Sequence, residues 1–277
     1  MPNTNVDFSI IIVNYNSTAW LLRAIESWRA CHAHSQVSYE FIIADNNSSL
    51  PQQEQLKNSL TDDKSHVKLF FLGENLGFAR ANNLAATHSQ ADYLVFLNPD
   101  TICTQNLLDA GLSALSQAGV GLVAPRLLLP DGRTQAYAYG PFPTLATIYQ
   151  DKILRQSSSI LASSLSPPVV DWLSGACLMI SRANFARLGG FTADYFMYFE
   201  DVDLCHKAVQ AGLRNYLLTT VSLTHVGGEK KALSHQRRLD YFRSQARYFQ
   251  RWRPREYWPL LILRVPYQLY CYLHDPP

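Results

Sequence analysis

The sequence has few cysteines, and no two of them are spaced as a metal-binding or redox pair requires. The five are scattered along 277 residues, at Cys31, Cys103, Cys177, Cys205 and Cys271. A zinc site or a disulfide framework is therefore not expected, and a reducing compartment fits this cysteine usage best.

Two kinds of apolar segment are also absent. No uncharged apolar run is long enough to span a bilayer. The first residues lack a basic region and a small-residue cleavage site, so we expect no signal peptide. Together these absences predict a cytoplasmic protein.

The composition supports a folded domain with an unevenly charged end. Hydrophobic residues make up 47% and charged residues 17%, which is enough apolar material for a sizeable core. The net charge is only +2, yet residues 237–277 hold eight arginines against three acidic residues. That asymmetry indicates an anionic partner for the last segment.

Apolar runs and amphipathic stretches alternate through the first half of the chain. We expect strands at 8–13, 41–44, 67–72, 93–97 and 120–124, with helices between them. This alternation predicts an α/β fold with a Rossmann-like, doubly wound, mostly parallel sheet. Residues 125–170 lose the pattern, which returns at 171–180, in a helix from Glu200 and in two short strands at 216–219 and 221–225.

Polar clusters follow four of these strands, at 14–16, 45–49, 75–80 and 98–100. Each cluster alone has the composition of an ordinary turn. Ligands of doubly wound sheets bind at the carboxyl ends of the strands, where all four clusters are expected. The set as a whole therefore favours a binding site at this edge.

Asp100 ends the run from Tyr93 and follows Asn98 and Pro99. One interpretation is a carboxylate ligand for Mg²⁺ or Mn²⁺, with phosphate oxygens completing the coordination. The other is a β-turn in which Asp100 caps the next helix. The residues alone leave both open.

Glu200 and Asp201 begin a helix after an aromatic run at 195–199. Acidic residues in a first helical turn are favoured by the helix dipole without any further role. Aromatic surroundings, however, desolvate a carboxylate and make it more basic, which suits a general base. His225 ends a predicted strand beside Gly227, and its place on the same edge makes it a candidate ligand although a lone histidine is more often structural.

Seven motifs occur in a fixed order over residues 8 to about 228: IIIVNYN (10–16), IIADNNSS (42–49), ENLGFARANN (74–83), YLVFLNPDT (93–101), WLSGACLMISR (172–182), GGFTADYFMYFEDVDLCHKAVQAG (189–212) and the His225 block. No single motif is specific, but the ordered set resembles the inverting family 2 glycosyltransferases of the GT-A fold. It looks most like their bacterial rhamnosyltransferase branch.

The resemblance implies roles on the donor side. Val13, Asn14 and Tyr15 would flank the base of a nucleotide-sugar, and Asp45 would hydrogen-bond the base or ribose. Asn75 and Arg80 would lie on the diphosphate side. Asn98 and Asp100 match the D-x-D motif, with Asp100 as the metal-binding carboxylate and His225 as a further metal ligand in some members.

It also implies roles on the acceptor side. Asp201 matches the catalytic base, which would deprotonate the acceptor hydroxyl in a single displacement with inversion. Glu200 would bind acceptor hydroxyls, and Trp172, Ser174 and Gly175 would shape the pocket where donor and acceptor meet.

The sequence departs from the family pattern at three points. Asn98 replaces the first Asp of D-x-D, so the metal loses one possible anion. Val13 stands where many members have Pro. The Q-x-x-R-W motif of processive synthases is missing, because Gln250, Arg251 and Trp252 are adjacent. We therefore expect addition of one or a few sugars.

The implied activity is transfer of L-rhamnose from dTDP-L-rhamnose to a glycan or a polyprenyl-diphosphate-linked acceptor in bacterial cell-surface polysaccharide synthesis. The alternatives are a UDP-sugar-dependent glucosyl, galactosyl or N-acetylglucosaminyl transferase, or a catalytically inactive glycan-binding module. An oxidoreductase is disfavoured because no G-x-G-x-x-G follows the first strand. A sugar nucleotidyltransferase is disfavoured because no glycine-rich phosphate loop follows the first strand. No feature of the sequence indicates a nucleic-acid partner.

We expect a glycosyltransferase domain over 1–228, with a nucleotide-binding half at 1–124 and an acceptor-side half at 125–228. Residues 229–277 would form a basic, aromatic helical tail. Such a tail is typical of interfacial attachment to an anionic membrane surface, here the inner face of the cytoplasmic membrane. The alternative is a helical hairpin packed on the domain with solvated arginines.

Overall fold

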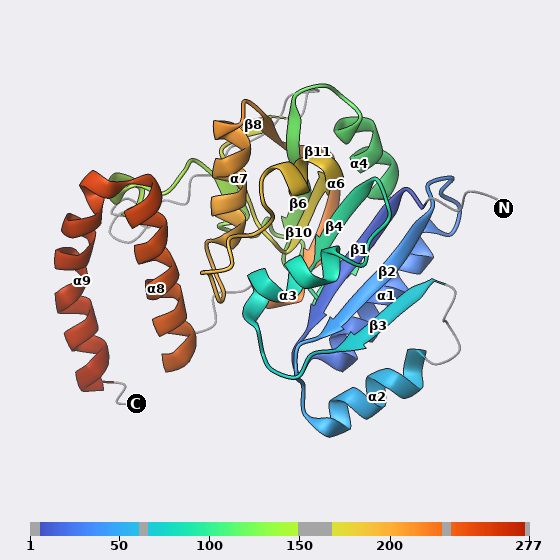
Figure 1. Cartoon of the computed structure of the whole chain (residues 1–277), viewed down its shortest axis with the longest axis horizontal. Coiled ribbons are helices and arrows are strands. Elements are labelled where there is room, and N and C mark those ends of the chain that lie inside the picture. Colours follow the sequence, from blue (N-terminus) through green and yellow to red (C-terminus); the bar gives the residue numbers. More distant parts are fainter. Residues whose placement is uncertain (1–5, 61–65, 149–167, 229–233, 275–277) are drawn as a thin grey trace.

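A computed structural model describes residues 6–60, 66–148, 168–228 and 234–274, with side chains as far as Val265. Helices cover both faces of a central sheet, and a helical hairpin lies beside α7 at one end (Figure 1). The helices are α1 (Thr18–His32), α2 (Leu50–Leu60), α3 (Gly77–Ala86), α4 (Leu108–Leu115), α6 (Arg182–Arg187), α7 (Glu200–Gln210), α8 (His235–Trp252) and α9 (Pro254–His274), with a 3-10 turn, η1, at Val226–Gly228.

The main sheet has the strand order β3-β2-β1-β4-β10-β6-β11-β5, with β8 paired to β11. Its strands are β1 (Phe8–Asn14), β2 (Tyr39–Asp45), β3 (Val67–Phe71), β4 (Tyr93–Leu97), β5 (Thr101–Cys103), β6 (Val120–Leu128), β8 (Val169–Val170), β10 (Cys177–Ser181) and β11 (Arg214–His225); β7 (Tyr139–Gly140) and β9 (Trp172–Leu173) form a separate pair. β3, β2, β1 and β4 run parallel, and β10 lies antiparallel between β4 and β6. The predicted α/β class and largely parallel sheet are confirmed.

Strand β1 shows why its segment folds as a buried strand. Ile10 and Ile12 point into one core with α1, while Ile11 points into the other with α3, α7 and α8. All three are fully buried. A strand covered on both faces needs apolar residues at every position, which is the pattern the sequence displays.

The antiparallel strand β10 brings a distant segment to the carboxyl edge of the parallel strands. Cys177, its first residue, pairs with Leu97, the last residue of β4. Residues 174–176 therefore lie beside Asn98, and the end of β11 reaches the same edge because His225 pairs with Thr101. Sheet pairing thus gathers residues from three parts of the sequence.

Three details differ from the predicted elements. The two short strands at 216–225 are one strand, β11, because a register shift between Leu218 and Ser222 absorbs the interruption. β6 extends to Leu128. The element after Asp100 is the short strand β5 and not a helix, so the expectation that Asp100 might cap a helix was wrong.

The basic tail folds as a hairpin of α8 and α9. Tyr248 and Phe249 of α8 are fully buried against the domain. In α9 the buried guanidinium of Arg264 donates to the carbonyl oxygen of Phe242 at 3.0 Å. The packed hairpin, one of the two alternatives, is therefore what the structure shows, and none of the described helices combines the length and hydropathy of a membrane span.

Candidate functional site

The ends of β1 and β2 are joined by a buried hydrogen bond. Asn14 donates from Nδ2 to Oδ2 of Asp45 at 2.8 Å, and both side chains are fully buried. The other oxygen, Oδ1 of Asp45, accepts from the backbone N–H of Ser48 at 2.9 Å. The carboxylate is thereby held in one orientation at the floor of the edge.

A second bond joins the ends of β2 and β3. Asn46 donates from Nδ2 to Oδ1 of Asn75 at 2.8 Å, and its own Oδ1 accepts from the N–H of Leu76. Gly77 then turns the chain into α3 with a φ of 77°, and a Cβ there would collide with Phe196. Asn75 is therefore fixed next to the segment that precedes α7.

Two predicted donor residues present exposed side chains at this edge. Tyr15 is 51% exposed, so its ring is available to a ligand, and Val13 beside it is partly buried. Arg80 is exposed and donates from Nε to the carbonyl oxygen of Ala193 at 3.0 Å.

Asp100 lies in a tight turn between β4 and β5. Asn98 enters the turn with its backbone N–H donated to the carbonyl oxygen of Ala176 at 2.9 Å. The carbonyl oxygen of Asn98 then accepts from Oγ1 of Thr101 at 2.8 Å. These bonds hold the Asp100 side chain, which is 31% exposed, at the surface of the edge.

His225 faces Asp100 across this turn. Its Nε2 lies 3.3 Å from Oδ1 of Asp100 and 3.4 Å from Nδ2 of Asn98. Its Nδ1 lies 2.9 Å from Oε1 of Gln135, which can only accept. With Nδ1 directed at this acceptor, Nε2 is the ring nitrogen that faces the carboxylate of Asp100.

The turn that follows His225 leaves no room for a side chain. A Cβ on Gly227 would collide with Oδ2 of Asp100, and one on Gly228 would collide with Oε1 of Gln135. The Gly-Gly pair is thus what allows β11 to end so close to Asp100. Gln135 was not among the predicted site residues, since it lies in a segment without a recognisable pattern.

The electrostatic surroundings keep Asp100 ionised. Burial raises its pKa, but the hydrogen bond and charge of His225, together with the charge of Arg237, outweigh burial. The pKa of Asp100 consequently lies below its ordinary value.

Glu200 and Asp201 follow a strained stretch of backbone. Tyr198 and Phe199 both adopt left-handed conformations, with φ of 70° and 67°. Such a conformation is unfavourable for bulky aromatic residues, and it persists only where the surrounding structure imposes it. Here it sets the direction in which α7 begins.

Asp201 is held by backbone donors on both sides. Its Oδ2 accepts from the N–H of Gly175 at 2.7 Å, and its Oδ1 accepts from the N–H of Val202 at 2.8 Å. Burial nevertheless outweighs these bonds and raises the pKa of Asp201 above its ordinary value. A Cβ at Gly175 would lie 3.4 Å from that of Asp201, an ordinary van der Waals contact, so space alone does not require glycine here.

Glu200 is only 6% exposed, and its Oε2 has no hydrogen-bond partner among the described residues. Burial, and next the charge of Asp201, raise its pKa well above the ordinary value. A buried carboxyl oxygen without a partner is costly to the fold.

The two carboxylate centres are neighbours through the backbone. Gly175 binds Asp201, and the next residue, Ala176, binds Asn98 at the start of the Asp100 turn. Ser174 accepts from the N–H of Ala176, while Trp172 donates from its indole to the carbonyl oxygen of Pro141. The structure therefore brings together Asp100, His225, Asp201, Glu200 and the 172–175 segment.

Asp203, which was not predicted, links α7 to the tail. Its fully buried carboxylate accepts from Oγ1 of Thr192 at 2.6 Å and from the indole of Trp252 at 2.7 Å. One turn on, the ring of His206 stacks between Phe142 and Trp252, with centroid distances of 4.1 and 3.9 Å. Helix α7 is thus fastened to the end of α8.

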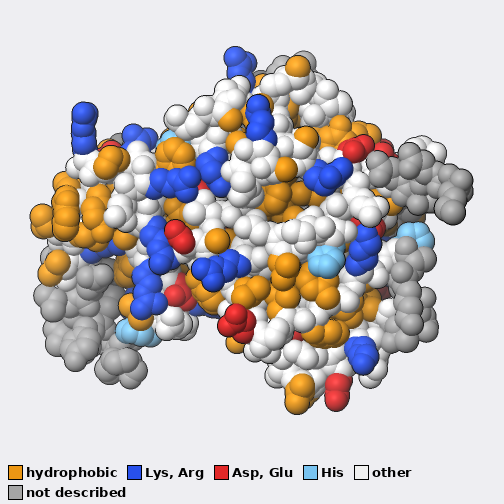
Figure 2. Space-filling view, in the orientation of Figure 1, with side chains coloured by type: hydrophobic (Ala, Val, Ile, Leu, Met, Phe, Trp, Pro, Cys, Tyr) orange, Lys and Arg blue, Asp and Glu red, His pale blue; other side chains and the backbone are white. Residues whose placement is uncertain are grey.

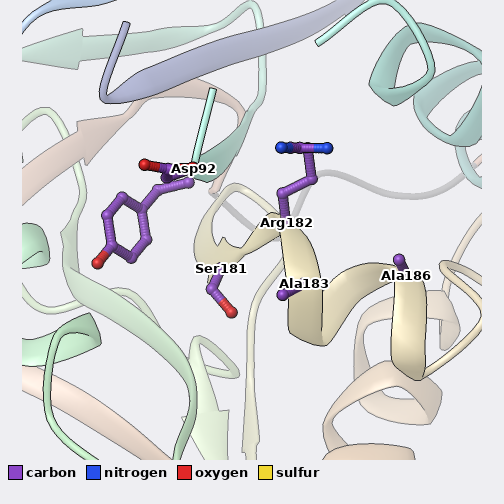
Figure 3. Close-up of a pocket in the computed structure, with 6 residues that line it drawn as sticks. Asp92, Ser181, Arg182, Ala183 and Ala186 are labelled. Atoms are coloured by element: carbon purple, nitrogen blue, oxygen red, sulfur yellow. The ribbon is translucent and has the colours of Figure 1, made fainter. Parts of the chain in front are cut away.

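A separate pocket of about 350 Å³ lies at the other end of β4 (Figure 3). Asp92, Tyr93, Ser181 and Arg182 line it with Ala183 and Ala186. Asp92 precedes β4, whereas Asp100 follows it, so the length of the strand separates this pocket from the carboxylates. It takes no part in the site.

A family model supplies the deciding comparison. Glycosyl transferase family 2 matches residues 9–184, which is more than half of the chain. The chain belongs to glycosyl transferase family 2. The predicted family is thereby confirmed, and the protein is an enzyme of the sugar-transferring class.

Two of the relatives are named as rhamnosyltransferases. The chain is 26% identical over 226 residues to "Rhamnosyltransferase WbbL" of Escherichia coli K12, covering 78% of this chain and 82% of that protein. It is 28% identical over 213 residues to the "N-acetylglucosaminyl-diphospho-decaprenol L-rhamnosyltransferase" of Mycobacterium tuberculosis, covering 66% of this chain and 65% of that protein.

Solved structures support the fold. GalNAc-T7 with UDP, GalNAc and Mn²⁺ superposes with a TM-score of 0.65 at 16% identity, over 90% of this chain and about half (48%) of that one. The mannosyltransferase PcManGT from Pyrobaculum calidifontis, with GDP-Man and Mn²⁺, gives 0.61 at 17% identity, over 90% and 64%. The predicted GT-A fold is confirmed.

Proposed function

We propose that this enzyme is an inverting, non-processive glycosyltransferase that moves L-rhamnose from dTDP-L-rhamnose to a hydroxyl of a glycan or lipid-linked acceptor. The observation that carries the proposal is the meeting of two carboxylate centres of opposite electrostatic character at one edge of the sheet. One favours an ionised carboxylate and the other a more basic one. Sugar transfer needs both, because a diphosphate leaves while a hydroxyl loses its proton.

Asp201 is proposed as the general base. Its raised pKa increases its affinity for the acceptor proton, and the two backbone donors fix its oxygens in place. Glu200, with its unpartnered oxygen, would bind the acceptor, and Trp172, Ser174 and Gly175 would shape the pocket around it. One displacement by the acceptor oxygen inverts the anomeric carbon, and no second carboxylate nucleophile is required.

Asp100 and His225 would hold Mg²⁺ or Mn²⁺. A carboxylate oxygen of Asp100 and an imidazole nitrogen of His225, which face each other at 3.3 Å, are donors that suit such a cation. Among the described residues no third acidic, His or Cys side chain joins them, which fits an ion that also binds substrate phosphates. When bound, the cation would neutralise charge on the departing diphosphate.

The donor would lie across the ends of β1 to β4. Val13, Asn14 and Tyr15 would flank its base and Asp45 would support the base or ribose, while Asn75, Arg80 and Asn98 would lie toward the diphosphate. The exposed ring of Tyr15 and the fixed Asp45 carboxylate support this placement.

The names of the relatives favour rhamnose and a lipid-linked acceptor. UDP-sugar transfer remains the second candidate, because GalNAc-T7 binds UDP on the same fold. The tail offers a surface for the membrane that carries such an acceptor: Trp258, Ile262 and Leu263 of α9 are each more than two-thirds exposed and lie near arginines. Association with the inner face of the cytoplasmic membrane would place the domain (1–228) over its substrate, with the tail (229–277) as the contact.

A donor panel tests the function. dTDP-rhamnose, UDP-glucose, UDP-galactose and UDP-N-acetylglucosamine are assayed with Mn²⁺, and the anomeric configuration of the product is read by NMR. We expect dTDP-rhamnose to be consumed fastest, with inversion. Retention of configuration would exclude the proposed inverting mechanism. Turnover of a UDP-sugar alone would replace dTDP-rhamnose as the assigned donor. If no donor is transferred or hydrolysed, a glycan-binding module is favoured. Liposomes of anionic lipid test the tail, which fails as a membrane contact if they do not retain the protein at low salt.

A further inference from the structure

A pocket of about 280 Å³ lies where the tail helix meets the sheet domain. Three segments line it, and its polar groups include Asn75 just before α3, Arg80 in α3, Asp194 in the loop before α7, and Arg247 in α8. Lys and Arg side chains gather on this face between the hairpin and the domain (Figure 2). The pocket therefore needs the tail to be complete.

The two arginines are positioned but not neutralised. Arg80 donates from Nε to the carbonyl oxygen of Ala193, and Arg247 donates from Nη1 to that of Asp194. In the part of the chain that the structure describes, no ion pair joins either guanidinium to a carboxylate, including those of Glu74 and Asp194 in the same lining. Each keeps further N–H groups for a ligand.

Paired guanidinium groups bind phosphate oxygens through parallel hydrogen bonds. Asn75 adds a donor, since its Oδ1 accepts from Asn46 and Gly77 while its Nδ2 donates to no other group among the described residues. Glu74 and Asp194 would oppose a bare anion but accept hydrogen bonds from sugar hydroxyls. The ligand that satisfies both kinds of group is a diphosphate ester that carries a sugar or ribose.

We propose that Arg247, supplied by the C-terminal hairpin, completes with Arg80 a binding site for such a diphosphate ester. This inference rests on the proposed function and extends it to a segment beyond the family motifs. It makes the hairpin part of substrate binding. A hydrogen bond holds α8 in place for this role: Ser244, one turn before Arg247, donates from Oγ to the carbonyl oxygen of Met197 at 2.7 Å, near the start of α7.

Arg247→Gln, Arg80→Gln and the double variant test the site, with Arg243→Gln as the matched control. Arg243 lies on the same helix, is exposed and reaches only Asp240, at 3.7 Å. Affinities for UDP, dTDP, inorganic pyrophosphate and farnesyl diphosphate are measured by calorimetry with Mn²⁺. We expect each pocket variant to weaken binding of at least one diphosphate by about tenfold, since hydrogen bonds to charged groups are involved, and Arg243→Gln to leave all affinities unchanged.

The ligand series separates the two sources of a diphosphate. Loss confined to UDP and dTDP assigns the pocket to the donor, and loss confined to farnesyl diphosphate assigns it to a prenyl-linked acceptor. Unchanged affinity of the double variant for all four ligands overturns the proposal. Thymidine binding and the thermal midpoint are measured for each variant as controls. Loss of an anion contact should change neither, whereas distortion of the loop at 193–196 should change both.

A different pattern identifies a failure of the proposed function. If the wild-type protein transfers no sugar from any donor but still binds pyrophosphate through Arg80 and Arg247, the diphosphate site stands and the assigned reaction falls. Arg247→Lys keeps the charge but not the fork, and we expect it to restore only part of the affinity that Arg247→Gln loses. Full restoration would contradict paired hydrogen bonds from this guanidinium to the ligand, and Arg243→Lys is the control that should cost no affinity.

Discussion

Asp100 and Asp201 lie at one edge of this sheet, and their surroundings shift their pKa values in opposite directions. Asp100 faces an imidazole and feels the charge of Arg237, so its pKa is lowered. Asp201 meets only backbone N–H groups in a desolvated position, so its pKa is raised. The comparison teaches that position, and not residue type, assigns one aspartate to a cation and the other to a proton.

Among the variants that test this comparison, Asp201→Asn should have the largest effect on sugar transfer. The amide keeps the shape but cannot take a proton, so we expect transfer to fall by about a thousandfold, as for other general bases. Donor binding, measured by calorimetry, should change less than twofold. Asp92→Asn, an exposed position at the far end of β4, is the control and should transfer sugar normally. An active Asp201→Asn enzyme would falsify the assignment.

The Asp100 centre should fail differently. Asp100→Asn or His225→Ala should weaken Mn²⁺-dependent binding of the nucleoside diphosphate by roughly tenfold to a hundredfold, because a metal ligand is lost. Gly227→Ala should also weaken this binding, although it replaces no metal ligand, because its Cβ would collide with Oδ2 of Asp100 and displace that carboxylate. Excess EDTA should reduce wild-type binding to the level of the Asp100 variant. If the variants bind as tightly as the wild type in Mn²⁺, these residues do not hold the ion.

The contacts that hold α7 to the tail can be weakened without replacing a residue of either centre. Asp203→Asn removes the charge that Lys207 and Arg251 approach, and we expect the free energy of unfolding to fall by about 3 kcal/mol, as when one partner of a buried ion pair is lost. Transfer should drop about tenfold, through Asp201 losing its position. Trp252→Phe keeps an aromatic ring but not the N–H, and it should lower the free energy of unfolding, measured with denaturant, by less than Asp203→Asn does. Equal activity in both variants and the wild type would show that the hairpin does not position α7.

Glu200 and Asp100 should contribute to the free energy of unfolding with opposite dependence on pH. Its folded-state pKa is raised, so its ionisation destabilises the fold as pH increases from its ordinary pKa through the raised value. Asp100 behaves oppositely, and its contribution is lost as pH falls through its lowered pKa. Glu200→Gln should therefore stabilise the protein at neutral pH by about 1 kcal/mol, a thermal shift of roughly 2–4 °C. The gain should vanish below the ordinary glutamate pKa, and a gain that is independent of pH would point to another cause.

The sequence predicted the parts of this site that lie on regular elements. Asn14, Asp45 and Asp100 follow buried strands, whose apolar runs are easy to recognise, and Asp201 opens an amphipathic helix. His225 was a candidate because its predicted strand ends at the same edge and because the resemblance implies a metal ligand there. Its position beside Asp100 depends on β11 and β5 meeting across more than a hundred residues.

What escaped prediction depends on contacts between distant segments. Gln135 has no local pattern, and only the fold brings it to His225. Asp203 looked like a further acidic residue of a helix start, and its role needs Trp252, 49 residues away. The Gly227–Gly228 pair was visible in the sequence, but its reason, the approach of Asp100 and Gln135, is not.

The most direct test of the two-centre account is a carboxyl-carbon NMR titration of the enzyme labelled at aspartate, without added metal. Asp100→Asn and Asp201→Asn assign the two resonances by their disappearance. The account predicts that Asp201 titrates above the ordinary aspartate range and Asp100 below it. Two resonances that titrate together in the ordinary range, or in the reverse order, would contradict it.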